Sequence, residues 1–68
     1  MSAKVSLAGA RVSAGFTQEQ LAEKMGVSRQ TIIDWESGKR EMRTAYFHLF
    51  CVVTNFSEDD IFLPIRST

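Results

Sequence analysis

The sequence predicts a small all-α domain, and three observations support this prediction. Apolar residues recur at helical spacing, residues that start or stop helices stand between these stretches, and a core built from 68 residues is marginal unless helices pack locally. The hydrophobic fraction of 44% suffices for a compact fold, so disorder is not expected. We predict one domain that contains five helices.

The most informative stretch, residues 18–36, predicts two short helices joined at a glycine. Thr17 is a good N-cap for the first helix, and Gln20 stands at the spacing of a capping box. Gly26 ends this helix because glycine enters the left-handed conformation at little steric cost. Ser28 is a good N-cap for the second helix. This pattern is the helix-turn-helix.

One face of the second helix is mostly polar. At about 100° per residue, this face carries Gln30, Ile33, Asp34 and Ser37, with Arg29 at its edge. Ile32 and Trp35 point the other way, toward the expected core. A buried helix would not carry such a polar side, and a merely solvated helix would carry more charges there. The pattern therefore indicates a recognition surface.

The remaining helices are predicted from their start and stop signals. The first runs from Val5 or Ser6 to Ala14 and is stopped by Gly15. The fourth runs from Thr44 to Val53 or Thr54. Its expected core positions are Phe47, Phe50, Cys51 and Thr54, and Asn55 offers a left-handed exit.

A fifth, short helix is predicted to begin at Ser57 and to end at Pro64. Ser57 is its expected N-cap, and the acidic residues that follow suit the positive end of a helix. The apolar residues Ile61, Phe62, Leu63 and Ile65 either cover the core or supply a dimer surface. Residues 1–4 are expected to fray, and residues 65–68 to form a tail.

The run from Gly15 to Ile32, followed by Trp35-Glu36 and Gly38-Lys39, resembles the Cro/CI-type helix-turn-helix family of phage and bacterial repressors, the Xre family. A weaker resemblance continues to about Ile61. The resemblance implies a compact, five-helix, lambda-repressor-like fold in which helices 2 and 3 form the helix-turn-helix. Residues 1–68 would then be a single DNA-binding domain.

The resemblance also implies base contacts from Arg29, Gln30 and Asp34 in the major groove of DNA. Arg29 can donate to guanine or bind a phosphate, Gln30 can pair with adenine, and Asp34 can accept from cytosine N4. Ile33 lies on the same face and can contact a thymine methyl group. Each good bidentate pair discriminates between bases by roughly 1–3 kcal/mol.

Phosphate contacts are expected around the helix-turn-helix. The expected residues are Gln18, Ser28 or Thr31, Lys39, Arg40 and, at the end of the same basic stretch, Arg43. The alternative for residues 39–43 is a solvated charged loop. Few contacts per subunit imply weak binding by one copy, so we expect a homodimer on half-sites ~34 Å apart.

An ion pair between Arg11 and Glu36 is implied by the resemblance, because the family pairs an arginine at the first position with the glutamate of the Trp-Glu-x-Gly ending. Such a pair would join the first helix to the recognition helix. Removing one partner of a partly buried pair costs roughly 3–5 kcal/mol. The alternative is two independently solvated charges.

Charge is the main observation against DNA binding. Eight basic residues balance eight acidic ones, and the pI is near 6.5. The distribution is uneven, however: residues 1–43 hold seven basic and five acidic side chains, a balance of +2, and residues 44–68 carry −2. A basic rim can therefore exist on a neutral protein.

The sequence offers little for metal binding or catalysis. Cys51 is the single cysteine and is expected to be a buried thiol, not a redox sensor. His48 is expected to be a surface or a satisfied histidine, neither a metal ligand nor a base. Adjacent acids at residues 58–60 would point apart instead of holding a metal. No cofactor is expected. With no phosphate-binding loop and no convergent acid pair, we do not expect an enzyme.

The leading hypothesis is a sequence-specific transcriptional regulator that represses by occupying an operator. The alternative is a protein-interaction module, such as an antirepressor or an antitoxin-like partner, which the neutral charge favours modestly. No signal peptide or membrane span is seen, so a cytoplasmic protein is expected. The chain fits either a complete short regulator or a trimmed DNA-binding domain.

Overall fold

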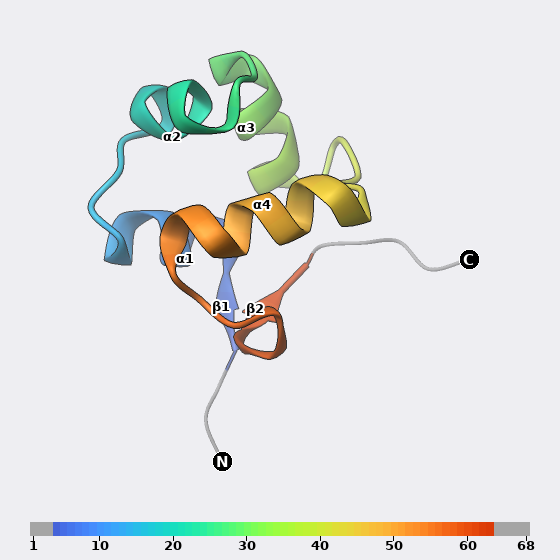
Figure 1. Cartoon of the computed structure of the whole chain (residues 1–68). Helices are drawn as coiled ribbons and strands as arrows, with labels where there is room; N and C mark the ends of the chain where they lie inside the picture. The colour runs from blue at the N-terminus through green and yellow to red at the C-terminus, as the bar shows by residue number, and fades with distance from the viewer. Residues whose placement is uncertain (1–3, 64–68) are drawn as a thin grey trace.

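Four α-helices make up most of the computed structural model, which describes residues 4–63. They are α1 (Leu7–Ser13), α2 (Gln18–Met25), α3 (Arg29–Ser37) and α4 (Thr44–Thr54). A 3-10 turn, η1 (Glu58–Asp60), and two short strands, β1 (Val5–Ser6) and β2 (Ile61–Phe62), complete the order. Figure 1 shows α2 and α3 at one end of the molecule and the strand pair at the opposite end. The predicted helix-turn-helix class is confirmed.

The predicted count of five helices is wrong, because the last segment forms η1 and then β2. Ser57 does cap η1, since its hydroxyl accepts from the Asp59 N–H at 3.3 Å. Ile61 then pairs with Val5 in a parallel ladder, and its side chain is only 4% exposed. A helix this short is marginal alone, so burial and strand pairing decide its conformation.

The first helix, α1, was predicted to start at Val5 or Ser6, and it starts slightly later. Val5 and Ser6 are extended and pair with β2, so α1 starts at Leu7. Ser6 is the N-cap, because its hydroxyl accepts from the Gly9 N–H at 2.9 Å. A cap residue has extended backbone angles, which is why Ser6 can serve both the strand and the helix.

The junction between α2 and α3 has the predicted caps. The Thr17 hydroxyl accepts from the Gln20 N–H at 3.0 Å, and the Gln20 side chain accepts from the Thr17 N–H at 2.9 Å. Gly26 has a φ of 72°, the left-handed conformation that favours glycine. The Ser28 hydroxyl accepts from the Thr31 N–H at 3.1 Å and starts α3. Local sequence therefore determines this corner.

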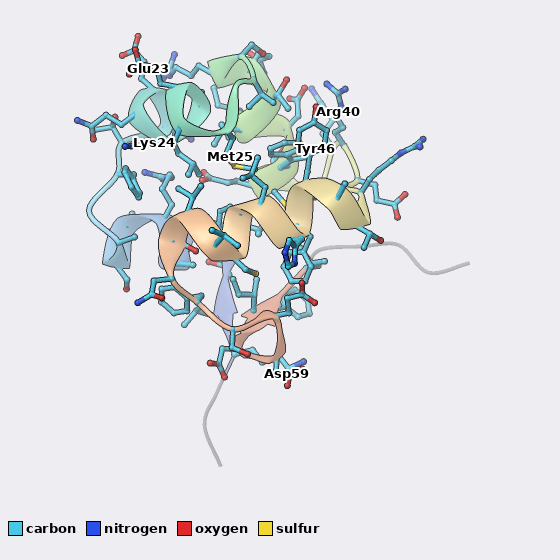
Figure 2. The ribbon with its side chains drawn as sticks, viewed as in Figure 1. Glu23, Lys24, Met25, Arg40, Tyr46 and Asp59 are labelled. Atoms are coloured by element: carbon cyan, nitrogen blue, oxygen red, sulfur yellow. The ribbon has the colours of Figure 1, made fainter. Side chains whose placement is uncertain are left out.

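Buried residues of all four α-helices form the core, and its largest fully buried ones come from α2, α3 and α4. The largest fully buried side chains are Leu21, Ile32 and Phe50, one from each of these helices. Trp35 is 3% exposed, and the centroid of its ring system lies 5.2 Å from the ring centroid of Tyr46 on α4. Figure 2 shows Tyr46 on the side of α4 that faces α3. These contacts fix α3 to the rest of the fold.

The inner face of α4 contains the predicted residues. Phe50, Cys51 and Thr54 are buried, and Phe47 is half-buried. The Thr54 hydroxyl donates to the Phe50 carbonyl at 2.8 Å, so its burial leaves no unpaired donor. Asn55 ends α4 with a φ of 63°, which confirms the left-handed exit.

Some predictions fall outside the described residues. These are the fraying of residues 1–3, the helix end at Pro64, the position of Ile65 and the tail at residues 65–68. Lys4 is described, and it is exposed and belongs to no helix or strand. Within residues 4–63, no helix has the length and apolar character needed to cross a membrane.

Candidate nucleic-acid interface

The two faces of α3 have opposite environments. Thr31, Ile32 and Trp35 are buried, and they hold the helix against the core. Arg29 and Gln30, in the first turn, are exposed. The other two predicted base contacts, Ile33 and Asp34, are half-buried at the margin of this face. The two most exposed of the four predicted base contacts therefore lie in the first turn of α3.

Gln30 and Asp34 are joined by a hydrogen bond that we did not predict. The Gln30 Nε2 donates to the Asp34 Oδ1 at 3.0 Å. The residues are four positions apart, and this spacing places two side chains next to each other on a helix. The i, i+4 spacing was therefore the signal in the sequence that would have identified this pair.

The loop after α3 folds back onto the helix. Gly38 ends α3 with a φ of 80°, and the Arg40 N–H then donates to the Asp34 carbonyl at 3.1 Å. The same carbonyl accepts from the Ser37 hydroxyl at 3.3 Å. These bonds hold the loop beside the exposed face of α3.

Arg40 also reaches the first turn of α3. Its guanidinium donates to the Thr31 Oγ1 at 3.4 Å, and Figure 2 shows Arg40 at the same end of the molecule as α2 and α3. The Thr31 hydroxyl lies 2.9 Å from the Ser28 hydroxyl, and Thr31 is 9% exposed. Of the two residues whose hydroxyls were predicted to reach phosphate, Ser28 is exposed and Thr31 is buried.

Basic side chains are also frequent in the loop that follows α3. Lys39, Arg40 and Arg43 are exposed, and Arg43 makes no side-chain cap bond to α4. The acidic turn η1 lies at the opposite end of the molecule, where Figure 2 labels Asp59. The zero net charge of the chain therefore combines a balance of +2 over residues 1–43 with −2 over residues 44–68, and three of the eight basic residues lie in the loop after α3.

Glu36, at the end of α3, is bonded to two other segments. The Arg11 Nε donates to Glu36 Oε2 at 2.6 Å, and a second guanidinium nitrogen lies 3.5 Å from Oε1. The Gln18 side chain donates to Oε1 at 3.0 Å. Arg11 also donates to the Phe16 carbonyl at 2.8 Å. The Arg11 and Glu36 side chains are 13% and 10% exposed, so this cluster is largely shielded from water.

This cluster sets the relative position of three helices. Arg11 lies in α1, Gln18 begins α2 and Glu36 lies in the last turn of α3. Gln18 was predicted to contact phosphate, and the structure bonds its amide nitrogen to Glu36, with a second N–H left to donate. The contact between Gln18 and Glu36 was not predicted, since residues 18 positions apart show no local spacing signal.

Two titratable side chains, His48 and Cys51, lie outside this surface. His48 is exposed, as predicted, and its Nδ1 lies 3.3 Å from Glu58. Burial raises the pKa of the Cys51 thiol, and the Glu58 carboxylate adds to this effect. In residues 4–63, no three His, Cys, Asp or Glu side chains gather at a position that could hold a metal ion.

Two capped helices joined at a left-handed glycine, with a polar first turn on the second, define the helix-turn-helix class of protein. A family described as helix-turn-helix matches residues 7–61 of this chain. The chain therefore belongs to this family, in agreement with the resemblance to the Cro/CI-type, or Xre, proteins.

Two curated relatives share this region. One, from Archaeoglobus fulgidus, is described as an uncharacterized HTH-type transcriptional regulator and is 38% identical over 53 residues, which cover 78% of this chain and 76% of the relative. A second, from Methanothermobacter thermautotrophicus, has the same description and is 59% identical over 29 residues, covering 43% of this chain and 42% of the relative. No solved structure matches the chain.

Proposed function

We propose that this chain is a sequence-specific DNA-binding domain, and that it acts as a repressor by occupying an operator. One observation carries this proposal: α3 is anchored by Ile32 and Trp35 while Arg29 and Gln30 project from its first turn. An α-helix fits the major groove, where such side chains can contact base edges. The relatives described as HTH-type transcriptional regulators support the same function.

The residues divide into two groups by their chemistry. The base-reading group consists of Arg29, Gln30, Ile33 and Asp34 on α3. The phosphate-binding group consists of Gln18, Ser28, Lys39, Arg40 and Arg43. Phosphate contacts set the position of a protein on the duplex, and base contacts give sequence preference. Arg40 belongs to the second group because it lies beside α3 and is exposed.

We further propose that two copies bind together on DNA. The few cations around one α3 give weak binding by a single copy, and a dimer doubles the number of phosphate contacts. The molecule measures 32 × 28 × 18 Å, a size that allows two copies to lie side by side on half-sites one turn of DNA, ~34 Å, apart. Phe62, 59% exposed, is one apolar side chain available for such a contact.

The test is selection from a randomised pool of DNA duplexes at about 50 and 200 mM salt, because phosphate-driven affinity falls steeply over this range. We expect enrichment of a two-fold-symmetric sequence by the wild-type chain and its loss in the Arg29→Ala/Gln30→Ala variant. Both side chains are exposed, so the variant should keep the melting temperature of the wild type. Asp59→Ala, at the opposite end, is the matched control.

Absence of enrichment at both salt concentrations would contradict DNA reading and favour the protein-interaction module. One observation supports that second function: α4 contains no Asp, Glu, Lys or Arg, and its Val52 is 65% exposed. A protein partner on this face would be lost in Val52→Glu and kept in the charge reversals Arg29→Glu and Lys39→Glu. DNA binding would show the reverse pattern.

A further inference from the structure

The side-chain amide of Gln30 has a defined orientation in the structure. Its Nε2 donates to the Asp34 Oδ1 at 3.0 Å. A carboxylate only accepts hydrogen bonds, so the amide nitrogen must face Asp34 and the amide oxygen must face away from it. Rotation of the amide by 180° would place two acceptors against each other. Asp34 therefore selects one of the two amide orientations of Gln30.

Asp34 is itself held in place. Its backbone carbonyl accepts from the Arg40 N–H at 3.1 Å and lies 3.3 Å from the Ser37 hydroxyl. Asp34 is half-buried, whereas Gln30 is exposed. The carboxylate is thus attached to the better fixed part of the surface, and the amide it holds extends into solvent.

The fixed orientation changes which base the amide can pair with. Adenine presents N6–H as a donor and N7 as an acceptor, which match the free oxygen and the second N–H of Gln30. Guanine presents two acceptors, O6 and N7, in the major groove. A bidentate contact with guanine would need both N–H groups of the amide, and one of them is already donated to Asp34.

We propose that Asp34 is a positioning residue for Gln30, and that the pair makes the protein prefer adenine over guanine at the base pair that Gln30 contacts. The inference rests on the proposed DNA-binding function. Asp34 is one of the base-reading residues of that function. In addition, it influences the choice of base at the Gln30 position by orienting the Gln30 amide.

Two variants of Asp34 separate the hydrogen bond from the charge. Asp34→Asn and Asp34→Ala both remove the negative charge. Only asparagine keeps an oxygen that can accept from Gln30, although its NH2 group can also donate to the Gln30 oxygen in the reverse amide orientation. Both variants should bind all DNA sequences somewhat more tightly, because a negative charge near the phosphates is gone. The difference between them reports the hydrogen bond alone.

The measurement is equilibrium binding to the sequence that the wild-type chain selects and to the same sequence with adenine replaced by guanine at one position. That position is identified as the one at which Gln30→Ala loses its preference. We expect the wild type to favour adenine about tenfold, as a bidentate pair allows. Asp34→Asn should keep part of this preference, because the accepting contact is still available but no longer exclusive, and Asp34→Ala should reduce it to about twofold or less.

A double variant tests whether Asp34 acts through Gln30. In the Gln30→Ala background, Asp34→Ala should leave the base preference at this position unchanged. A further change there would mean that Asp34 contacts the base by itself, and the proposal would be overturned. It would also be overturned by a wild-type preference for guanine, or by Asp34→Ala keeping the full preference for adenine.

A measurement without DNA separates this inference from the proposed function. The side-chain amide protons of Gln30 should shift in the NMR spectrum of Asp34→Ala, and they should shift less in Asp34→Asn, which keeps an acceptor. Unchanged resonances in Asp34→Ala would overturn the pair even if DNA binding holds. The expected shifts without any selected DNA sequence would confirm the pair but refute its role in base reading together with the proposed function.

Discussion

Different interactions stabilise the two ends of the molecule. At the end formed by α2 and α3, Glu36 bonds Arg11 and Gln18 in a cluster shielded from water. At the opposite end, a two-residue parallel ladder joins β1 to β2, and the nearby pair of His48 and Glu58 is 74% and 50% exposed. The first end has the tighter polar network, which suits a surface that must present side chains in fixed positions.

The two ends also differ in charge. Lys39, Arg40 and Arg43 follow α3, while Glu58, Asp59 and Asp60 form η1. Figures 1 and 2 show these segments at opposite ends of the molecule. Net charge summed over the whole chain hides this separation. A pI near 6.5 therefore reflects an uneven distribution of charge: three of the eight acidic residues lie in η1, away from α3, and residues 1–43 keep an excess of two basic side chains.

The largest expected effect comes from breaking the shielded ion pair. Glu36→Ala leaves the Arg11 guanidinium without its carboxylate, and we expect the free energy of unfolding to fall by about 3 kcal/mol. Glu58→Ala removes the acid of the exposed pair and should cost less than about 0.5 kcal/mol. Urea unfolding of both variants measures the difference. Equal losses would show that the two ends are stabilised alike.

The next effect concerns DNA binding and salt. Lys39→Ala removes one phosphate-binding cation, so the slope of log affinity against log salt should decrease by about 1 per bound subunit. Asp59→Ala changes one charge at the other end and should leave the slope unchanged. Titrations at several salt concentrations measure both slopes. A similar change in both variants would refute the separation of charge that the comparison describes.

The smallest effect concerns Cys51, a buried residue of α4. Burial raises the pKa of its thiol, so the folded chain holds this proton more tightly than the unfolded chain does. The contribution of this thiol to the free energy of unfolding should therefore be constant below the ordinary thiol pKa and should decline as the pH rises beyond it. Thermal unfolding between about pH 8 and 9.5 measures the decline. Cys51→Ala should lack it, and an identical decline in that variant would assign it to other groups.

The corner of the helix-turn-helix could be predicted from sequence because its signals are local. Thr17, Gln20 and Ser28 satisfy backbone groups within their own helical turn, and Gly26 provides a backbone conformation that other residues avoid. Such interactions depend on three or four neighbouring residues. The ion pair of Arg11 and Glu36 was expected only through the family resemblance, since nothing local connects these positions.

The tertiary structure decided what depends on residues far apart in the chain. Val5 and Ile61 form strands because folding brings both ends of the domain together, and the pairing overrides the helix that Ser57 and the following acids suggested. The contact between Arg40 and Thr31 likewise requires the loop to fold back on α3.

The sequence by itself determined which residues start and end the four α-helices to within two positions, and which side of α3 is polar. Only the tertiary structure decided that Thr31 is buried, that Gln18 bonds Glu36 and that the acidic turn lies away from α3. The physical reason is range. Caps and helical periodicity are set within one or two turns, whereas burial, distant hydrogen bonds and charge separation depend on how the helices pack.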